Sequence, residues 1–117
     1  MFDGTLRWLT LLALLLDPTP PPLLCIEEPE LGLHPDLIPA LGRLLDDAST
    51  RTQLLITTHS EMLVSAFTET PERVVVCERP GTATTFRRLT REPLEHWLRD
   101  YSLGYVWRTG ELGGNRW

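Results

Sequence analysis

A short apolar run that is followed at once by acids and a proline is the feature that most constrains this chain. Residues 23–26 are Leu-Leu-Cys-Ile, and Glu27, Glu28, Pro29 and Glu30 come directly after them. Four consecutive apolar residues are typical of a strand buried on both faces of a parallel sheet. In open parallel sheets, ligands bind beyond the carboxyl ends of the strands. The sequence therefore predicts a buried strand that ends in a functional site.

Helical and strand-like segments alternate around this run and predict an α/β chain. Strand-rich runs cover 23–27, 53–57, 73–78 and 84–89, and helical patterns cover 5–16, 36–47, 61–67 and 92–101. The first of these helices is apolar nearly all round, so we expect it to be buried. The tail from Trp107 to Gly114 reads as irregular.

The helix at 36–47 joins the first two predicted strands. A crossover of this kind is right-handed and connects parallel strands, so both strands end at the same edge of the sheet. Glu27 and Glu28 end the first strand, and Thr57, Thr58 and His59 end the second. If the strands are neighbours, two carboxylates and an imidazole converge at that edge.

Adjacent carboxylates suit two linked tasks in nucleotide hydrolysis. One can hold Mg²⁺, which prefers oxygen ligands and keeps several waters. The other can orient an attacking water or accept its proton, and a neighbouring histidine can hydrogen-bond a terminal phosphate. The alternative is that the acids only precede a helix, whose dipole favours negative charge. For Glu30 that alternative stays as open as a functional role, and for His34 we expect a turn-fixing role.

Composition limits the class of protein. The net charge of −5 argues against a dedicated nucleic-acid surface. All eleven basic residues are arginine, so the lysine that a phosphate-binding loop normally needs is absent. Cys25 and Cys77 lie in apolar runs, where we expect core residues of a reduced, cytoplasmic protein. The apolar run from Trp8 to Leu16 is too short to span a bilayer.

Residues 23–30 resemble the Walker B motif of ABC-type P-loop ATPases. More narrowly, they resemble the RecF, SMC and OLD-like group that is often catalogued as AAA-type ATPases. In that group the strand ends in an acid that binds Mg²⁺, which corresponds to Glu27, and in a catalytic glutamate, which corresponds to Glu28. The first acid is usually Asp, so Glu27 departs from the pattern.

Two further segments extend the resemblance. Residues 31–36 are similar to the D-loop of that group, and residues 57–60 are similar to its switch-histidine motif. The resemblance implies that His59 contacts the γ-phosphate.

Residues 2–7 resemble the end of the ABC signature motif, which touches ATP from across a dimer. The resemblance implies that Asp3, Gly4 and Thr5 would meet a partner's nucleotide. The motif normally has Ser where Phe2 stands, so one phosphate donor is missing.

The resemblance thus implies that residues 1–117 are the C-terminal half of an ABC-type ATPase domain. Its fold would be a partial P-loop NTPase fold, mainly a parallel sheet flanked by helices. The sequence contains no Gly-x-x-x-x-Gly-Lys-Ser/Thr loop. We therefore expect ATP and Mg²⁺ to be used only with a Walker A-containing half or a second ATPase head, with DNA reached only through a larger assembly and no membrane partner. Whether the chain is a truncated gene, a misplaced start or part of a split protein stays open.

Two rival hypotheses remain. A non-catalytic docking or dimerisation module derived from such an ATPase is favoured by the missing lysine and by Phe2. A metal-dependent nuclease would use Glu27, Glu28, Glu30 and His59, and it would need a further carboxylate cluster.

Overall fold

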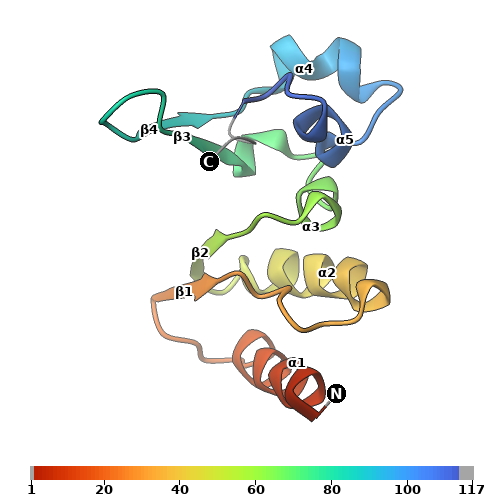
Figure 1. Cartoon of the computed structure of the whole chain (residues 1–117). Coiled ribbons are helices and arrows are strands. Elements are labelled where there is room, and N and C mark those ends of the chain that lie inside the picture. The colour runs from red at the N-terminus through yellow and green to blue at the C-terminus, as the bar shows by residue number, and fades with distance from the viewer. Residues whose placement is uncertain (1, 114–117) are drawn as a thin grey trace. The chain divides into compact units, whose positions relative to one another are not determined.

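The computed structural model describes residues 2–113, without the side chains of Phe2 and Asp3. The chain divides into two compact units, Met1–Leu63 and Val64–Trp117 (Figure 1). The helices and strands are α1 (Phe2–Leu15), β1 (Leu23–Glu27), the 3₁₀ helix η1 (Pro35–Leu37), α2 (Ile38–Ala48), β2 (Gln53–Thr57), α3 (Glu61–Ser65), the 3₁₀ helix η2 (Pro71–Arg73), β3 (Val75–Glu78), β4 (Thr85–Arg88), α4 (Arg91–Leu98) and α5 (Leu103–Arg108).

The first unit is built on a parallel pair of strands. β1 pairs with β2 in register from Leu23 opposite Gln53 to Glu27 opposite Thr57. The connection between them contains η1 and α2, and α2 runs alongside the two strands in Figure 1. The predicted strand–helix–strand crossover is therefore confirmed, and both strands end at one edge.

The core of the first unit is formed mainly by one stripe of each helix. Leu41 and Leu45 of α2 are 0% and 3% exposed, and Leu11 and Leu15 of α1 are 3% and 0% exposed. Spacings of four residues put each pair on one helical face. Elsewhere α1 is open to solvent, since Leu6 is 65% exposed and Leu9 is 56% exposed. The expectation of a helix buried all round is thus wrong, because only one of its faces packs against other described residues.

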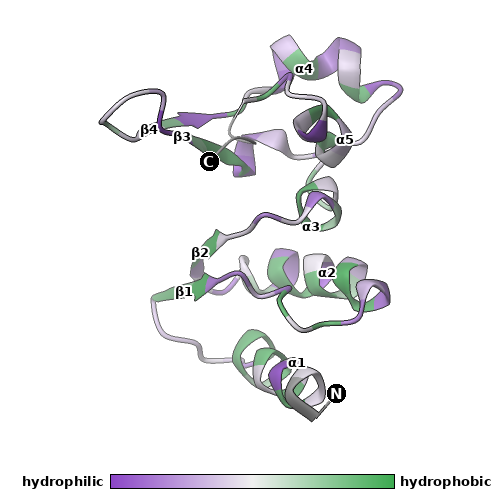
Figure 2. Ribbon diagram, in the orientation of Figure 1, coloured by the Kyte–Doolittle hydropathy of each residue, from purple (hydrophilic) through white to green (hydrophobic). Residues whose placement is uncertain are grey.

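The prediction that the first strand is buried on both faces is also wrong. Alternate residues of β1 and β2 are exposed and the others are only half-buried. Leu23 and Leu55 are 49% and 60% exposed, and Cys25 is exposed too. The physical reason is that the sheet contains two strands in the part of the chain that the structure describes. Figure 2 shows the hydrophobic colouring of these strands.

The second unit contains an antiparallel hairpin and two helices. β3 pairs with β4, from Val75 opposite Arg88 to Glu78 opposite Thr85. The core of this unit consists of Val64, Val76, Leu89, Leu94, Leu103, Val106 and Leu112. Cys77 is half-buried rather than a core residue. In residues 2–113 the two units give a mixed α/β chain with a small parallel sheet and helices, which is compatible with an AAA-like fold.

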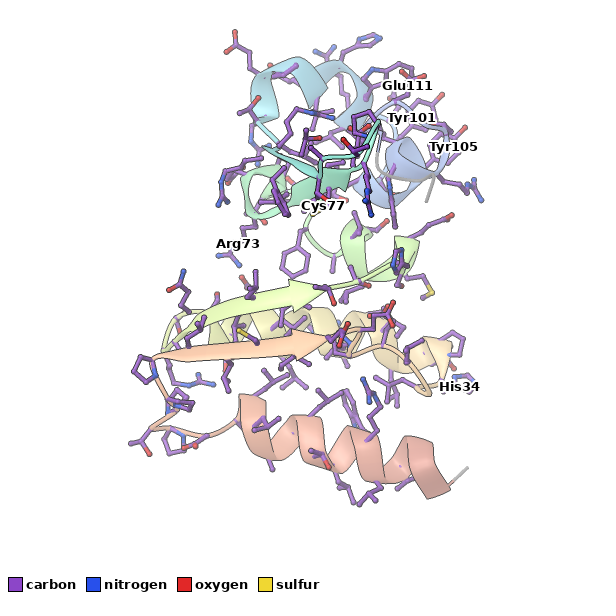
Figure 3. All side chains as sticks on the ribbon, turned by 60° about the vertical axis from the view of Figure 1, so that its left-hand side comes forward. His34, Arg73, Cys77, Tyr101, Tyr105 and Glu111 are labelled. Carbon is purple, nitrogen blue, oxygen red and sulfur yellow. The ribbon has the colours of Figure 1, made fainter. Side chains whose placement is uncertain are left out.

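The helix α5 corrects the prediction for the tail. Trp107 and Arg108 lie in this helix and not in irregular chain. Ser102 caps the helix by accepting a hydrogen bond from the Tyr105 backbone N–H at 3.3 Å. The rings of Tyr101 and Tyr105, both labelled in Figure 3, are stacked with centroids 4.8 Å apart. Gly114, at the end of the predicted tail, lies outside the described residues.

No helix in residues 2–113 combines the length and the apolar character that crossing a bilayer requires.

A pair of leucine substitutions tests the core of the first unit. Leu41→Ala should lower the free energy of unfolding by about 2–5 kcal/mol, because it leaves a cavity where a fully buried side chain packed. Leu55→Ala is the matched control and should change it by less than about 0.5 kcal/mol, since that side chain is mostly exposed. Urea unfolding followed through NMR signals of residues 23–57 measures both. Equal losses in the two variants would contradict this description of the core.

Candidate functional site

The site lies where β1 and β2 end. The backbone N–H of Glu28 donates to the carbonyl oxygen of Thr57 at 2.8 Å and approaches the Thr57 hydroxyl oxygen at 3.2 Å. The parallel pairing therefore continues one residue beyond Glu27. This contact fixes where the chain leaves β1, and so it fixes the start of the acidic loop.

The Glu28 side chain meets His59 at this edge. Its Oε1 lies 3.6 Å from the Nε2 of His59, which forms an ion pair when the ring is protonated. The His59 side chain is 65% exposed and that of Glu28 is 32% exposed, so a ligand in solvent can reach both. Of the two carboxylates predicted to converge with the imidazole, Glu28 therefore meets it in the structure. Glu27 is exposed at the end of β1, opposite Thr57.

Arg7 of α1 holds the backbone of the acidic turn. Its guanidinium donates to the carbonyl oxygens of Glu28 at 2.7 Å, of Glu27 at 3.4 Å and of Pro29 at 3.4 Å. Glu28 has a φ of 45°, and no other non-glycine residue within 2–113 has a positive φ. Because this conformation is strained for residues with a side chain, the Arg7 contacts stabilise a turn that the backbone alone disfavours.

The start of α1 also touches the loop after β1. A Cβ built on Gly4 would lie 2.5 Å from the carbonyl oxygen of Gly32, so only glycine allows this approach. Gly32 itself has a φ of 79°. The segments that resemble the signature motif and the D-loop are thus in backbone contact. The side chain of Asp3 lies outside the described residues.

His34 has a structural role, as predicted. Its Nδ1 accepts a hydrogen bond from the Asp36 backbone N–H at 3.1 Å and caps η1. Figure 3 labels this ring at the loop before α2.

A metal bound entirely by protein ligands does not fit this arrangement. Within residues 2–113, no three His, Cys, Asp or Glu side chains come together to hold a metal ion. Mg²⁺ is commonly bound through one or two carboxylates, waters and substrate phosphates. The exposed Glu27 beside Glu28 fits this mode, because a single carboxylate at an open edge leaves room for waters and phosphate. The nuclease hypothesis gains no support, since its further carboxylate cluster is not found in the described chain.

A comparison with known protein families identifies the family of this chain. Residues 3–65, more than half of the chain, match the family model described as "AAA domain, putative AbiEii toxin, Type IV TA system". The chain belongs to this family. The match covers α1, both parallel strands and His59, so the nucleotide-binding, ATPase-like module of the AAA domain contains the whole candidate site. AAA-family ATPases generally use ATP and Mg²⁺.

A search of curated proteins found no match to this chain.

Arg7 is the residue that sequence reasoning did not single out. Its signal was available, because Arg7 is the only basic residue before Arg43. What could not be read from the sequence is that its side chain reaches carbonyl groups twenty or more residues away. Every residue has a backbone carbonyl group, so the sequence cannot show which of them a side chain binds. Such a contact is seen only in the folded structure.

Two glycine substitutions test the contact between α1 and the loop. Gly4→Ala should lower the free energy of unfolding by about 1–3 kcal/mol, because the added methyl group collides with the Gly32 carbonyl group. Gly81→Ala is the matched control, since a Cβ there meets nothing within 4 Å. It should be neutral or stabilising by up to about 1 kcal/mol. Urea unfolding of the two variants compares them, and a Gly4→Ala protein as stable as wild type would exclude the close approach.

Arg7→Ala should destabilise the turn after β1 by about 1–3 kcal/mol, because strained backbone carbonyls lose their donors. Arg7→Lys should restore only part of this, since an ammonium group cannot spread over several acceptors as a guanidinium does. The exposed Arg43→Ala serves as the control. Unfolding free energies and the NMR signals of Glu27 and Glu28 provide the measurement. Identical behaviour of Arg7→Ala and Arg43→Ala would refute the role given to Arg7.

Proposed function

We propose that this chain is the C-terminal half of an ABC-type ATPase head and contributes the hydrolytic side of its ATP site. The single observation that carries the proposal is the pairing of Glu28 with His59 at the shared carboxyl edge of β1 and β2. A carboxylate and an imidazole 3.6 Å apart, both open to solvent, suit an attacking water and a terminal phosphate. The AAA domain match over the same residues supports a nucleotide as the ligand.

Each site residue has a separate task in this proposal. Glu27 would hold Mg²⁺, which would supply positive charge beside the phosphates. Glu28 orients the attacking water and accepts its proton, and His59 hydrogen-bonds the γ-phosphate. Gly4, Thr5 and Asp3, at the start of α1, meet the nucleotide of a second head.

The same proposal requires a partner that supplies the phosphate-binding loop. The first unit leaves large apolar side chains exposed to solvent on α1 and on the two strands, including Leu6, Leu9, Leu23 and Leu55. We take these side chains as part of the surface that a partner covers. A Walker A-containing half is the occupant that fits, because it would bring both apolar cover and the missing loop. The DNA just upstream of the coding sequence should encode Gly-x-x-x-x-Gly-Lys-Ser/Thr if the two halves belong together.

The alternative is a non-catalytic docking or dimerisation module. The exposed leucines favour it equally, since they need a partner whether or not ATP is hydrolysed. Calorimetry of the isolated chain with ATP and Mg²⁺ tests whether the chain binds nucleotide without a partner. Binding by the chain alone would count against a purely structural module.

Glu28→Gln tests the proposed chemistry in a complete head, in which the chain is combined with a Walker A-containing half. ATP hydrolysis should fall at least about 100-fold while ATP stays bound, because an amide cannot take the proton of the attacking water. Turnover and retained nucleotide are both measured.

Glu69→Gln is the control for the loss of one negative charge at an exposed position. It should leave hydrolysis at the wild-type rate. Unchanged hydrolysis in the Glu28→Gln head would sink the assignment of this residue.

A further inference from the structure

Glu30 is the one acid of the loop after β1 to which the proposed function gives no task. Its position beyond Pro29 is compatible with simple solvation near the start of η1, where a negative charge is favoured. Its contacts in the structure point to a different role.

The carboxylate of Glu30 reaches across to the loop after β2. The backbone N–H of His59 donates to Oε2 of Glu30 at 3.4 Å. The other carboxylate oxygen, Oε1, is buried and has no hydrogen-bond partner among the described residues. An acid placed only for its charge would keep both oxygens in water, because burying an unpaired carboxylate oxygen is costly. The side chain is therefore held toward the protein, where it meets His59.

His59 lies in irregular chain between β2 and α3, so no helix or strand hydrogen bond fixes its backbone. Its neighbours are fixed locally. The Ser60 N–H donates to the Thr58 hydroxyl at 3.0 Å, and the Ser60 hydroxyl accepts from the Leu63 N–H at 3.1 Å. These bonds hold residues on either side of His59 but not its own N–H, which is bound by Glu30.

We propose that Glu30 is a positioning residue that holds the backbone of His59 so that its ring stays beside Glu28. Two acids of one loop then contact one histidine. Glu30 accepts a hydrogen bond from its backbone N–H, and Glu28 lies beside its ring. The effect on catalysis rests on the proposed function, whereas the hydrogen bond between Glu30 and the His59 backbone does not. Because the Pro29 ring fixes φ between the two acids, they are carried on a stiff piece of chain whose spacing suits both contacts.

The test uses the 117-residue chain, without nucleotide, and measures solvent exchange of the His59 backbone amide by NMR. Glu30→Ala should speed this exchange about 3- to 10-fold, because the amide loses its acceptor. Glu30→Gln should restore wild-type exchange, since an amide oxygen still accepts a hydrogen bond. Asp36→Asn is the matched control, as it removes one negative charge from the nearby helix η1, at a residue whose carboxylate lies beside His34.

Faster exchange in Glu30→Ala alone, with Glu30→Gln and Asp36→Asn like wild type, is the expected result. Unchanged exchange in Glu30→Ala would overturn the proposal. So would equally fast exchange in Asp36→Asn, which would indicate a general effect of charge, or in Glu30→Gln, which would remove the hydrogen-bond account.

A second readout separates this inference from the proposed function. In a complete head, Glu30→Ala should lower kcat for ATP at least 3-fold with little change in KM, and Glu30→Gln should restore it. If Glu28→Gln has no effect there, the proposed reaction fails while the exchange result still decides the Glu30 contact. If Glu28→Gln blocks turnover and Glu30→Ala does not lower kcat, the positioning role fails alone.

Discussion

The hydrogen bond from the Glu28 N–H to the Thr57 carbonyl oxygen is the contact on which the candidate site depends. It is the last rung of a parallel pair whose register runs from Leu23 opposite Gln53. Because side chains alternate between the faces of a strand, a register shifted by one residue would turn the acids to the other face. The pairing therefore fixes where the chain leaves β1, and it brings Glu28 beside His59 at the shared edge.

After this hydrogen bond the chain leaves regular structure, and side-chain hydrogen bonds replace strand pairing as the contacts that hold it. Glu28 adopts a positive φ, and the peptide groups around it are bound by Arg7 from α1. Gly4, on the first turn of the same helix, lies against Gly32. One helix thus contacts the acidic turn and the loop that follows it. In the proposed head, a partner's nucleotide at the start of α1 would act on the same helix that holds the hydrolytic turn.

Much of the first unit could be predicted from sequence because its signals are local or topological. The apolar runs predicted both strands, and the parallel pairing implied by a strand–helix–strand crossover placed Glu28 and His59 at one edge. Burial was predicted less well. Leu23 and Cys25 were expected in a core because four apolar residues in a row normally have cover on both faces, but a two-stranded sheet offers too little. The helix α5 was missed because its signal is short, consisting of a serine cap and the buried pair Leu103 and Val106.

The failed burial predictions and the missing phosphate-binding loop have the same physical explanation under the proposed function. A strand such as β1 keeps apolar residues on both faces only when both faces are covered in the working protein. Leu23 and Leu55 are exposed here, yet their chemistry is that of core residues. If a Walker A-containing half supplies that cover, hydrophobic burial drives the two halves together and brings the phosphate-binding loop to Glu27, Glu28 and His59 in the same step. Assembly and completion of the site would then be one event, since each half holds part of the core and part of the chemistry.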